Sequence, residues 1–242
     1  MGPVTEKRLA VLIDADNVSA DHLGPLLAEI ANLGVPSVRR MYGDWTSTQL
    51  KRWKDAANLH AVQPMQQFAY TQGKNSTDSA LIIDAMDLLH TGRFDGFCLV
   101  SSDSDFTRLA TRLRESGVTV YGFGAQKTPK PFVNACDRFT YFEVLTAPEE
   151  SKPAARPRRL SEKQLRGDAG LVGALRRAIA ATSDDSGWAN LGAVGSTIRN
   201  QAPEFDSRNW GFAKLGDLVE AIGLFEVKSS GTGNARLVRI SD

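Results

Sequence analysis

Apolar and polar positions along residues 8–145 form a pattern that predicts strands separated by helices. Short runs rich in branched apolar residues predict strands, and segments with an apolar residue every three or four positions predict helices. Strands joined through helices favour right-handed crossovers, so we expect an α/β fold with a mainly parallel sheet between two layers of helices. The expected strands cover 8–13, 38–42, 60–64, 94–101, 118–123 and 139–144, and the expected helices cover 19–33, 46–58, 77–90 and 106–116.

A second pattern begins after residue 145. Residues 146–168 contain three prolines, dense charge and few large apolar side chains, so we expect a flexible basic linker. Residues 169–242 then show three helical periods, at 171–181, 188–199 and 212–222, followed by alternating strands at 225–228 and 236–240. Three helices and a β-hairpin predict a small winged-helix domain.

Aspartates follow two of the predicted strands in the first region. Asp14 ends the strand at 8–13, whereas Asp103 and Asp105 follow the most hydrophobic strand, at 94–101. The carboxyl ends of parallel strands meet at one edge of a sheet, where open α/β folds place their active sites. Asp78 opens the helix at 77–90, which we expect to start at the same edge. Carboxylate oxygens suit Mg²⁺ or Mn²⁺, so we predict that Asp14, Asp78, Asp103 and Asp105 form a metal site for phosphoryl chemistry.

Structural roles compete with this assignment. Asp78 could serve only to stabilise the N-terminus of its helix through the helix dipole, and Asp105 could serve only as a helix cap. Asp16 alternates with Asp14, and Asp84 lies on a different helical face from Asp78, so we expect structural roles for Asp16 and Asp84.

Residues near these acids could bind substrate. Asn17 follows Asp16 in the strand-to-helix turn and could either stabilise that turn or orient a phosphate. Lys74 precedes Asp78 at the expected active edge. Basic and aromatic residues from 39 to 54 could also form a rim that contacts a nucleic-acid strand, because phosphates bind Lys and Arg and bases stack on aromatic rings. The candidates for that rim are Arg39, Arg40, Tyr42, Trp45, Lys51, Arg52, Trp53 and Lys54.

Charge differs between the two regions, although the net charge of the 242 residues is only +1. Residues 1–151 contain 15 basic and 18 acidic residues, and residues 152–242 contain 14 basic and 10 acidic residues. The basic excess suits nucleic acid if it gathers on one face. The pattern lacks a secretory signal or a long apolar run, and its two cysteines, Cys98 and Cys136, are typical of reduced core thiols. We therefore expect a cytoplasmic protein without a membrane partner.

Three ordered motifs within residues 8–145, LIDADN, KNSTDSALIIDAM and LVSSDSDF, resemble the NYN domain, a PIN-like nuclease fold found in bacterial DUF88/LabA-like proteins and eukaryotic RNA regulators. The resemblance implies ribonuclease chemistry that depends on Mg²⁺ or Mn²⁺. It places the acidic site at Asp14, Asp78, Asp103 and Asp105, and the family's asparagine at Asn17.

The last region resembles an OST-HTH/LOTUS domain, through LVGALRRAIA, WANLGAVGSTIRNQAPEFD and NWGFAKLGDLVEAIGLFEV. That resemblance implies binding of RNA or of a protein partner. The chain is thus expected to contain a nuclease domain at 1–145, a linker at 146–168 and a LOTUS domain at 169–242.

The leading hypothesis is a metal-dependent ribonuclease, and two others compete with it. A catalytically inactive RNA-binding adaptor would keep the same acids without turnover. A phosphatase of the haloacid dehalogenase type would use Asp14 as its nucleophile, with Asp16 as the acid–base partner. Asn17 departs from that second pattern, and Asp78 would have no role in it.

Overall fold

The computed structural model describes residues 6–45, 51–66, 76–145, 159–229 and 236–241. The chain divides into two compact units, Met1–Lys152 and Pro153–Asp242. Each unit has its own hydrophobic core, so each is described by itself.

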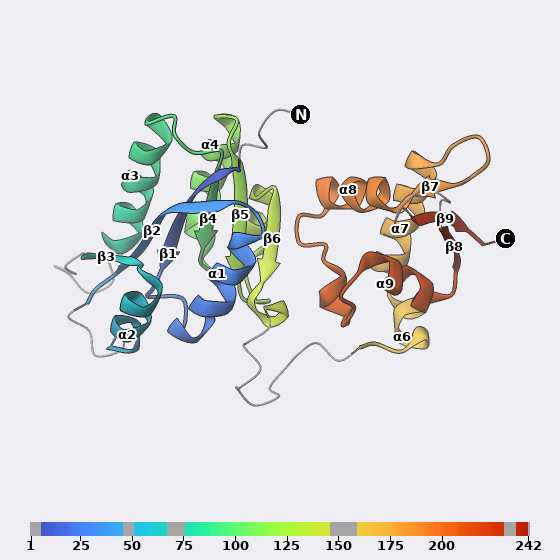
Figure 1. The fold of residues 1–242 in the computed structure, drawn as a ribbon, viewed down its shortest axis with the longest axis horizontal. Helices are drawn as coiled ribbons and strands as arrows, with labels where there is room; N and C mark the ends of the chain where they lie inside the picture. Colours follow the sequence, from blue (N-terminus) through green and yellow to red (C-terminus); the bar gives the residue numbers. More distant parts are fainter. Residues whose placement is uncertain (1–5, 46–50, 67–75, 146–158, 230–235, 242) are drawn as a thin grey trace. The chain divides into compact units, whose positions relative to one another are not determined.

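A sheet of six parallel strands forms the centre of the first unit (Figure 1). Its order is β3-β2-β1-β4-β5-β6, so the first and fourth strands along the chain are neighbours in the middle. Apart from exposed Arg8, the residues of β1 and β4 are buried, because helices cover both faces of a parallel sheet. The strands are β1 (Arg8–Asp14), β2 (Val35–Gly43), β3 (Gln63–Gln66), β4 (Gly96–Val100), β5 (Thr119–Gly124) and β6 (Arg138–Tyr141).

Side chains of β1 alternate between two apolar clusters, one on each face of the sheet. Ala10 and Leu12 pack with α3 (Ser76–His90), α4 (Thr107–Glu115) and α5 (Lys130–Ala135). Leu9, Val11 and Ile13 pack with α1 (Leu23–Ala31) and α2 (Lys51–His60). This three-layer arrangement confirms the α/β fold with helices on both faces of a parallel sheet.

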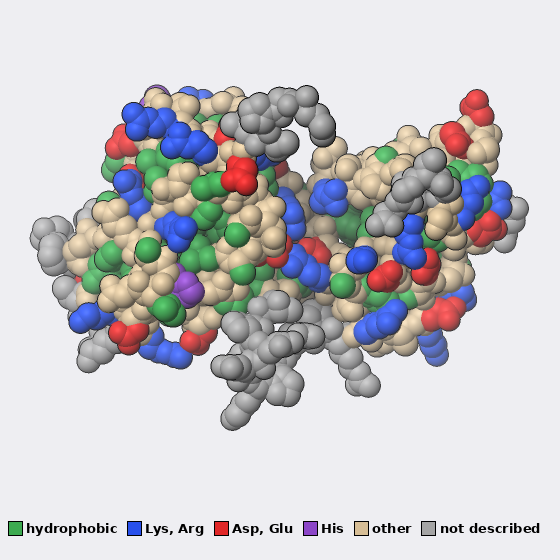
Figure 2. Space-filling view, in the orientation of Figure 1, with side chains coloured by type: hydrophobic (Ala, Val, Ile, Leu, Met, Phe, Trp, Pro, Cys, Tyr) green, Lys and Arg blue, Asp and Glu red, His purple; other side chains and the backbone are tan. Residues whose placement is uncertain are grey.

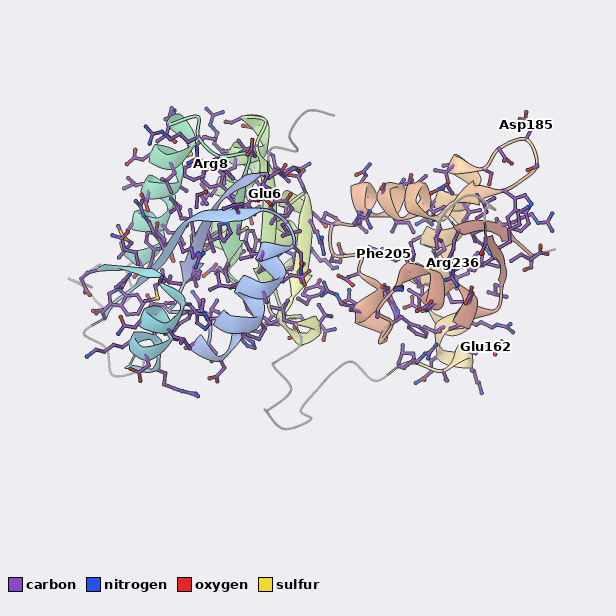
Figure 3. All side chains as sticks on the ribbon, viewed as in Figure 1. Glu6, Arg8, Glu162, Asp185, Phe205 and Arg236 are labelled. Atoms are coloured by element: carbon purple, nitrogen blue, oxygen red, sulfur yellow. The ribbon has the colours of Figure 1, made fainter. Side chains whose placement is uncertain are left out.

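The second unit is mainly helical. Its helices are α6 (Glu162–Gly167), α7 (Ala169–Thr182), α8 (Leu191–Gln201) and α9 (Leu215–Ile222). A small antiparallel sheet has the order β7-β9-β8, with β7 (Ala189–Asn190), β8 (Phe225–Ser229) and β9 (Arg236–Ile240). Asp185 lies in the loop after α7, and Arg236 begins β9 beside α9, where it pairs with Asp217 and Glu220 (Figure 3).

A helix lies within the range that was predicted to be a linker. Helix α6 lies inside the range 146–168 that the composition assigned to a flexible linker, whereas 146–158 fall outside the described residues. Ser161 and Gln164 form a capping box at its start, and Leu165 is fully buried in the core. The sequence pattern did not predict this helix, because the helix is densely charged and contributes only one side chain to the core.

Other boundaries shift for local reasons. The helix expected at 188–199 starts at Leu191, because the side chain of Asn190 caps it while Ala189 and Asn190 pair with β9. Helix α5 was not expected, since its six residues are too few to establish a helical period. The helix expected at 46–58 is seen as α2, and residues 46–50 lie outside the described residues.

Close packing of β5 against β6 yields a test of the fold. Gly122 pairs with Phe139, and an added β-carbon would lie 2.4 Å from Phe139 Cδ2 and 2.6 Å from Cys136 Sγ. Gly122→Ala should therefore lower the free energy of unfolding by about 2 kcal/mol in a urea titration. Gly24→Ala is the control, because a β-carbon there meets only ordinary contacts with His60, at 3.6 Å or more. Equal stability of the two variants would contradict the packing.

Candidate active site

Asp14, the last residue of β1, is completely buried, and three hydrogen bonds hold its carboxylate. Asn17 Nδ2 donates to Oδ2 over 2.8 Å, and the backbone N of Asn17 donates to Oδ1 over 3.3 Å. Ser101 Oγ donates to Oδ2 over 2.6 Å. The LIDADN motif thus folds as a turn around its own first aspartate, and a buried carboxylate is tolerated because it has donors.

Ser101 connects this turn to the second acidic motif. It follows β4 and is buried, and its hydroxyl also accepts a hydrogen bond from Asp103 N over 3.0 Å. Asp103 caps the short 3-10 helix η3 (Ser104–Phe106), accepting from Asp105 N at 2.9 Å. Because Phe106 is buried in the core, the turn is anchored and both aspartates stay at the carboxyl edge.

Helix α3 brings the third acid. Asp78 lies in its first turn, and carboxylate oxygens of Asp78, Asp103 and Asp105 all lie within 4.8 Å of one another. Among the described residues this is the group whose spacing could hold a metal ion, and Asp14 is not part of it. The structure therefore brings together three of the four predicted ligands at that spacing, while hydrogen bonds to Ser101 and Asn17 hold Asp14 beside them.

Electrostatics show how crowded the acids are. Burial raises the pKa of Asp78 to about 6, and the charges of Asp14, Asp103, Asp105 and Asp16 add to the shift. Burial also raises the pKa of Asp14, against the lowering effect of the hydrogen bonds from Ser101 and Asn17. Several negative charges therefore meet at Asp78, an arrangement that a bound cation would relieve.

The ligand chemistry fits a hard divalent cation. All three oxygen donors are carboxylates, which Mg²⁺ and Mn²⁺ prefer over sulfur or imidazole. The two cysteines are buried, and burial raises the pKa of both thiols far above its usual value. Asp78, Asp103 and Asp105 are thus the residues that could hold the ion, with Asp14 adding negative charge.

The predicted substrate-binding residues have varied surroundings. Asn17 is exposed, and both its backbone N and its side-chain amide donate hydrogen bonds to Asp14. The guanidinium of Arg40 pairs with Asp84, and Trp45 Nε1 donates to Met65 O over 2.9 Å. Lys74 lies outside the described residues. Substrate contacts by these four residues stay predictions.

The prediction of a rim of basic and aromatic residues is wrong for two of its members. Tyr42 is 1% exposed and Trp53 is 2% exposed, because both pack into the apolar clusters of the first unit. Neither ring can stack on a base. Sequence reasoning also missed Ser101, since a serine after an apolar strand gives no signal that it bridges two aspartates.

Charge on the second unit is mixed. Figure 2 shows basic and acidic side chains interspersed over its visible face. A denser feature is Trp188, whose ring lies under Lys228 Nζ at 3.7 Å and Arg239 Cζ at 4.8 Å from its centroid. Among the described residues, no helix is long and apolar enough to cross a membrane.

Comparison with solved structures gives several distant likenesses. A protein of unknown function from Vibrio parahaemolyticus is 17% identical, with a TM-score of 0.49, over 58% of this chain and 96% of that chain. An uncharacterized protein from Nitrosomonas europaea is 30% identical, with a TM-score of 0.27, over 40% of this chain and 93% of that chain. The WlbA dehydrogenase from Bordetella pertussis is 16% identical, with a TM-score of 0.34, over 70% and 43% of the two chains. No curated protein matches.

Family models match both units. The OST-HTH/LOTUS domain matches residues 168–237, which implies RNA binding. The NYN domain matches residues 8–145, more than half of the chain, and implies a nuclease-type fold. The matched range contains all four aspartates of the acidic edge, Asp14, Asp78, Asp103 and Asp105. The chain therefore belongs to the NYN domain family and also carries an OST-HTH/LOTUS domain.

Proposed function

We propose that this protein is a ribonuclease that hydrolyses RNA phosphodiester bonds and depends on Mg²⁺ or Mn²⁺. The observation that carries the proposal is the convergence of Asp78, Asp103 and Asp105 within 4.8 Å at the edge where a NYN domain implies nuclease chemistry. When bound, the cation supplies Lewis-acid chemistry, lowering the pKa of water and offsetting the charge that develops on the phosphate.

The chain's own residues divide the remaining work. Asp78, Asp103 and Asp105 bind the cation. Asp14 keeps the local charge negative, while Ser101 and Asn17 orient its carboxylate. We assign exposed Asp105 the alternative role of the base that accepts a proton from the attacking water, which requires its carboxylate to come within hydrogen-bond distance of that water.

The second unit is proposed to deliver RNA. Lys228 and Arg239, which lie over the ring of Trp188, can contact phosphates. A tethered binding module raises the effective concentration of substrate at the acidic site without touching the scissile bond. Loss of this unit should thus raise the RNA concentration needed for cleavage more than it lowers the maximal rate.

Burial argues against the phosphatase alternative. A nucleophilic aspartate needs a carboxylate oxygen facing its substrate, whereas Asp14 is completely buried and both of its oxygens accept hydrogen bonds. The inactive adaptor is the alternative that the cleavage experiment decides.

Replacing a proposed ligand should remove cleavage while keeping the fold. Asp103→Asn preserves the cap of η3, because asparagine also accepts from a helix N-terminus, yet it removes one charged ligand. We expect the rate of Mn²⁺-dependent cleavage of labelled RNA to fall by about a hundredfold or more. Asp87→Asn is the matched control, because Asp87 is exposed and lies nine positions beyond Asp78 on α3. Wild-type protein that binds RNA without cleaving it would support the adaptor instead.

Because the acids are crowded, replacing Asp78 should change the free energy of unfolding in opposite directions with and without metal. Because folding raises the pKa of Asp78 to about 6, the folded state binds this proton more tightly than the unfolded state. Metal-free protein thus loses stability as the pH rises from the usual carboxyl value through about 6. At about pH 7 in EDTA, Asp78→Asn should raise the free energy of unfolding by about 1 kcal/mol, a value reduced for solvent screening.

Saturating Mn²⁺ should reverse this order, because the wild type gains binding energy that the variant lacks. Urea titrations of the full chain at about pH 4 and about pH 7 measure both effects, and the two proteins should differ little at the lower pH. A variant that is less stable than the wild type in EDTA at the higher pH would show that the acids do not repel one another.

A further inference from the structure

Tyr42 on β2 contacts both the turn after β1 and helix α3, the two elements that carry Asp14 and Asp78. Its Cα pairs with that of Asp14 across strands β2 and β1, and its carbonyl accepts a hydrogen bond from Ala15 N over 2.9 Å. The backbone of Tyr42 therefore holds the start of the turn that contains Asp16 and Asn17. Its side chain is 1% exposed and lies among the apolar residues under α3.

The hydroxyl of Tyr42 donates to Asp84 Oδ2 on α3, and Arg40 Nη1 donates to Asp84 Oδ1. The side chains of Asp84 and Arg40 are only 17% and 25% exposed. Charged groups removed from water at this depth contribute little net stability, and their best-attested value is in fixing one packing arrangement.

The apolar contacts that hold helix α3 on the sheet are not directional, so hydrogen bonds to Asp84 add a constraint that these contacts lack. Leu81, Ala85 and Leu88 pack on the sheet, and apolar contacts permit small rotations and shifts along the helix axis. Asp78 at the start of the helix also lies close to Asp103 and Asp105, and like charges at this spacing repel one another. Asp84 lies six residues after Asp78, about 9 Å further along the axis, so hydrogen bonds at Asp84 resist that displacement.

We infer that Asp84, Tyr42 and Arg40 are positioning residues that fix α3 on β2 so that Asp78 stays within reach of Asp103 and Asp105. This inference rests on the proposed function, since it gives the three residues a role in cation binding. It also assigns Arg40 a place under the helix instead of a contact with RNA.

Two conservative variants test the inference in the full-length protein. Tyr42→Phe removes one hydroxyl, and Asp84→Asn removes the charge while keeping the shape. We expect each to raise the Mn²⁺ dissociation constant about tenfold, measured from free Mn²⁺ by electron paramagnetic resonance, with cleavage largely restored at saturating Mn²⁺. Tyr121→Phe and Asp87→Asn are the matched controls, because Tyr121 is a buried tyrosine on β5 and Asp87 is exposed on α3.

Hydrogen exchange in metal-free protein supplies a second readout. The amides of the first two turns of α3 should exchange about tenfold faster in both variants, whereas those of α4 should not change. A Mn²⁺ dissociation constant within about twofold of wild type, with unchanged exchange in α3, would overturn the inference even if the variants unfold more easily.

The two readouts separate this inference from the proposed function. If wild-type protein binds Mn²⁺ but cleaves no RNA, the ribonuclease proposal fails and the dissociation constants still decide the positioning role. If wild-type protein binds no Mn²⁺, the positioning of a cation site is overturned together with the ribonuclease, and faster exchange in α3 would then show a purely structural anchor.

Discussion

The parallel pairing of β1 with β4 is the interaction on which the acidic site depends. Leu9 to Ile13 pair in register with Gly96 to Val100, and both strands are buried on both faces. The two strands therefore end side by side and point in the same direction. The first polar residues after their buried segments, Asp14 and Ser101, meet there within hydrogen-bond distance. A shift of either strand by one residue would turn these side chains to the opposite face.

The rest of the site balances repulsion among the acids against the hydrogen bonds and packing that hold each acid in place. Asp103 and Asp105 are held by a capped turn, Asp14 by Ser101 and Asn17, and Asp78 by a helix fixed further along at Asp84. Burial and the charges of the neighbouring acids raise the proton affinity of Asp78, and a divalent cation would offset that repulsion. Rigid anchoring is what lets a site keep that unfavourable charge.

Much of this was open to sequence reasoning. The alternation of apolar strands and amphipathic helices predicted the parallel sheet, and aspartates placed directly after buried strands predicted the acidic edge. Short or polar elements escaped, such as α5 and α6, because a helical period needs more than six residues to be recognised. Trp53 and Tyr42 were misjudged because nearby basic residues suggested a nucleic-acid surface, whereas both rings fill the core.

Periodicity and motif order by themselves indicated the fold class, the two-part organisation and the grouping of Asp14, Asp78, Asp103 and Asp105 at one sheet edge. Strands joined through helices run parallel, so their carboxyl ends share an edge. Only the tertiary structure decided which acids share one spacing, why Asp14 stands apart from the other three, and that Arg40 and Tyr42 meet Asp84 across 44 and 42 residues. Such contacts join side chains from distant segments, and their geometry depends on how strands and helices pack, which no local pattern encodes.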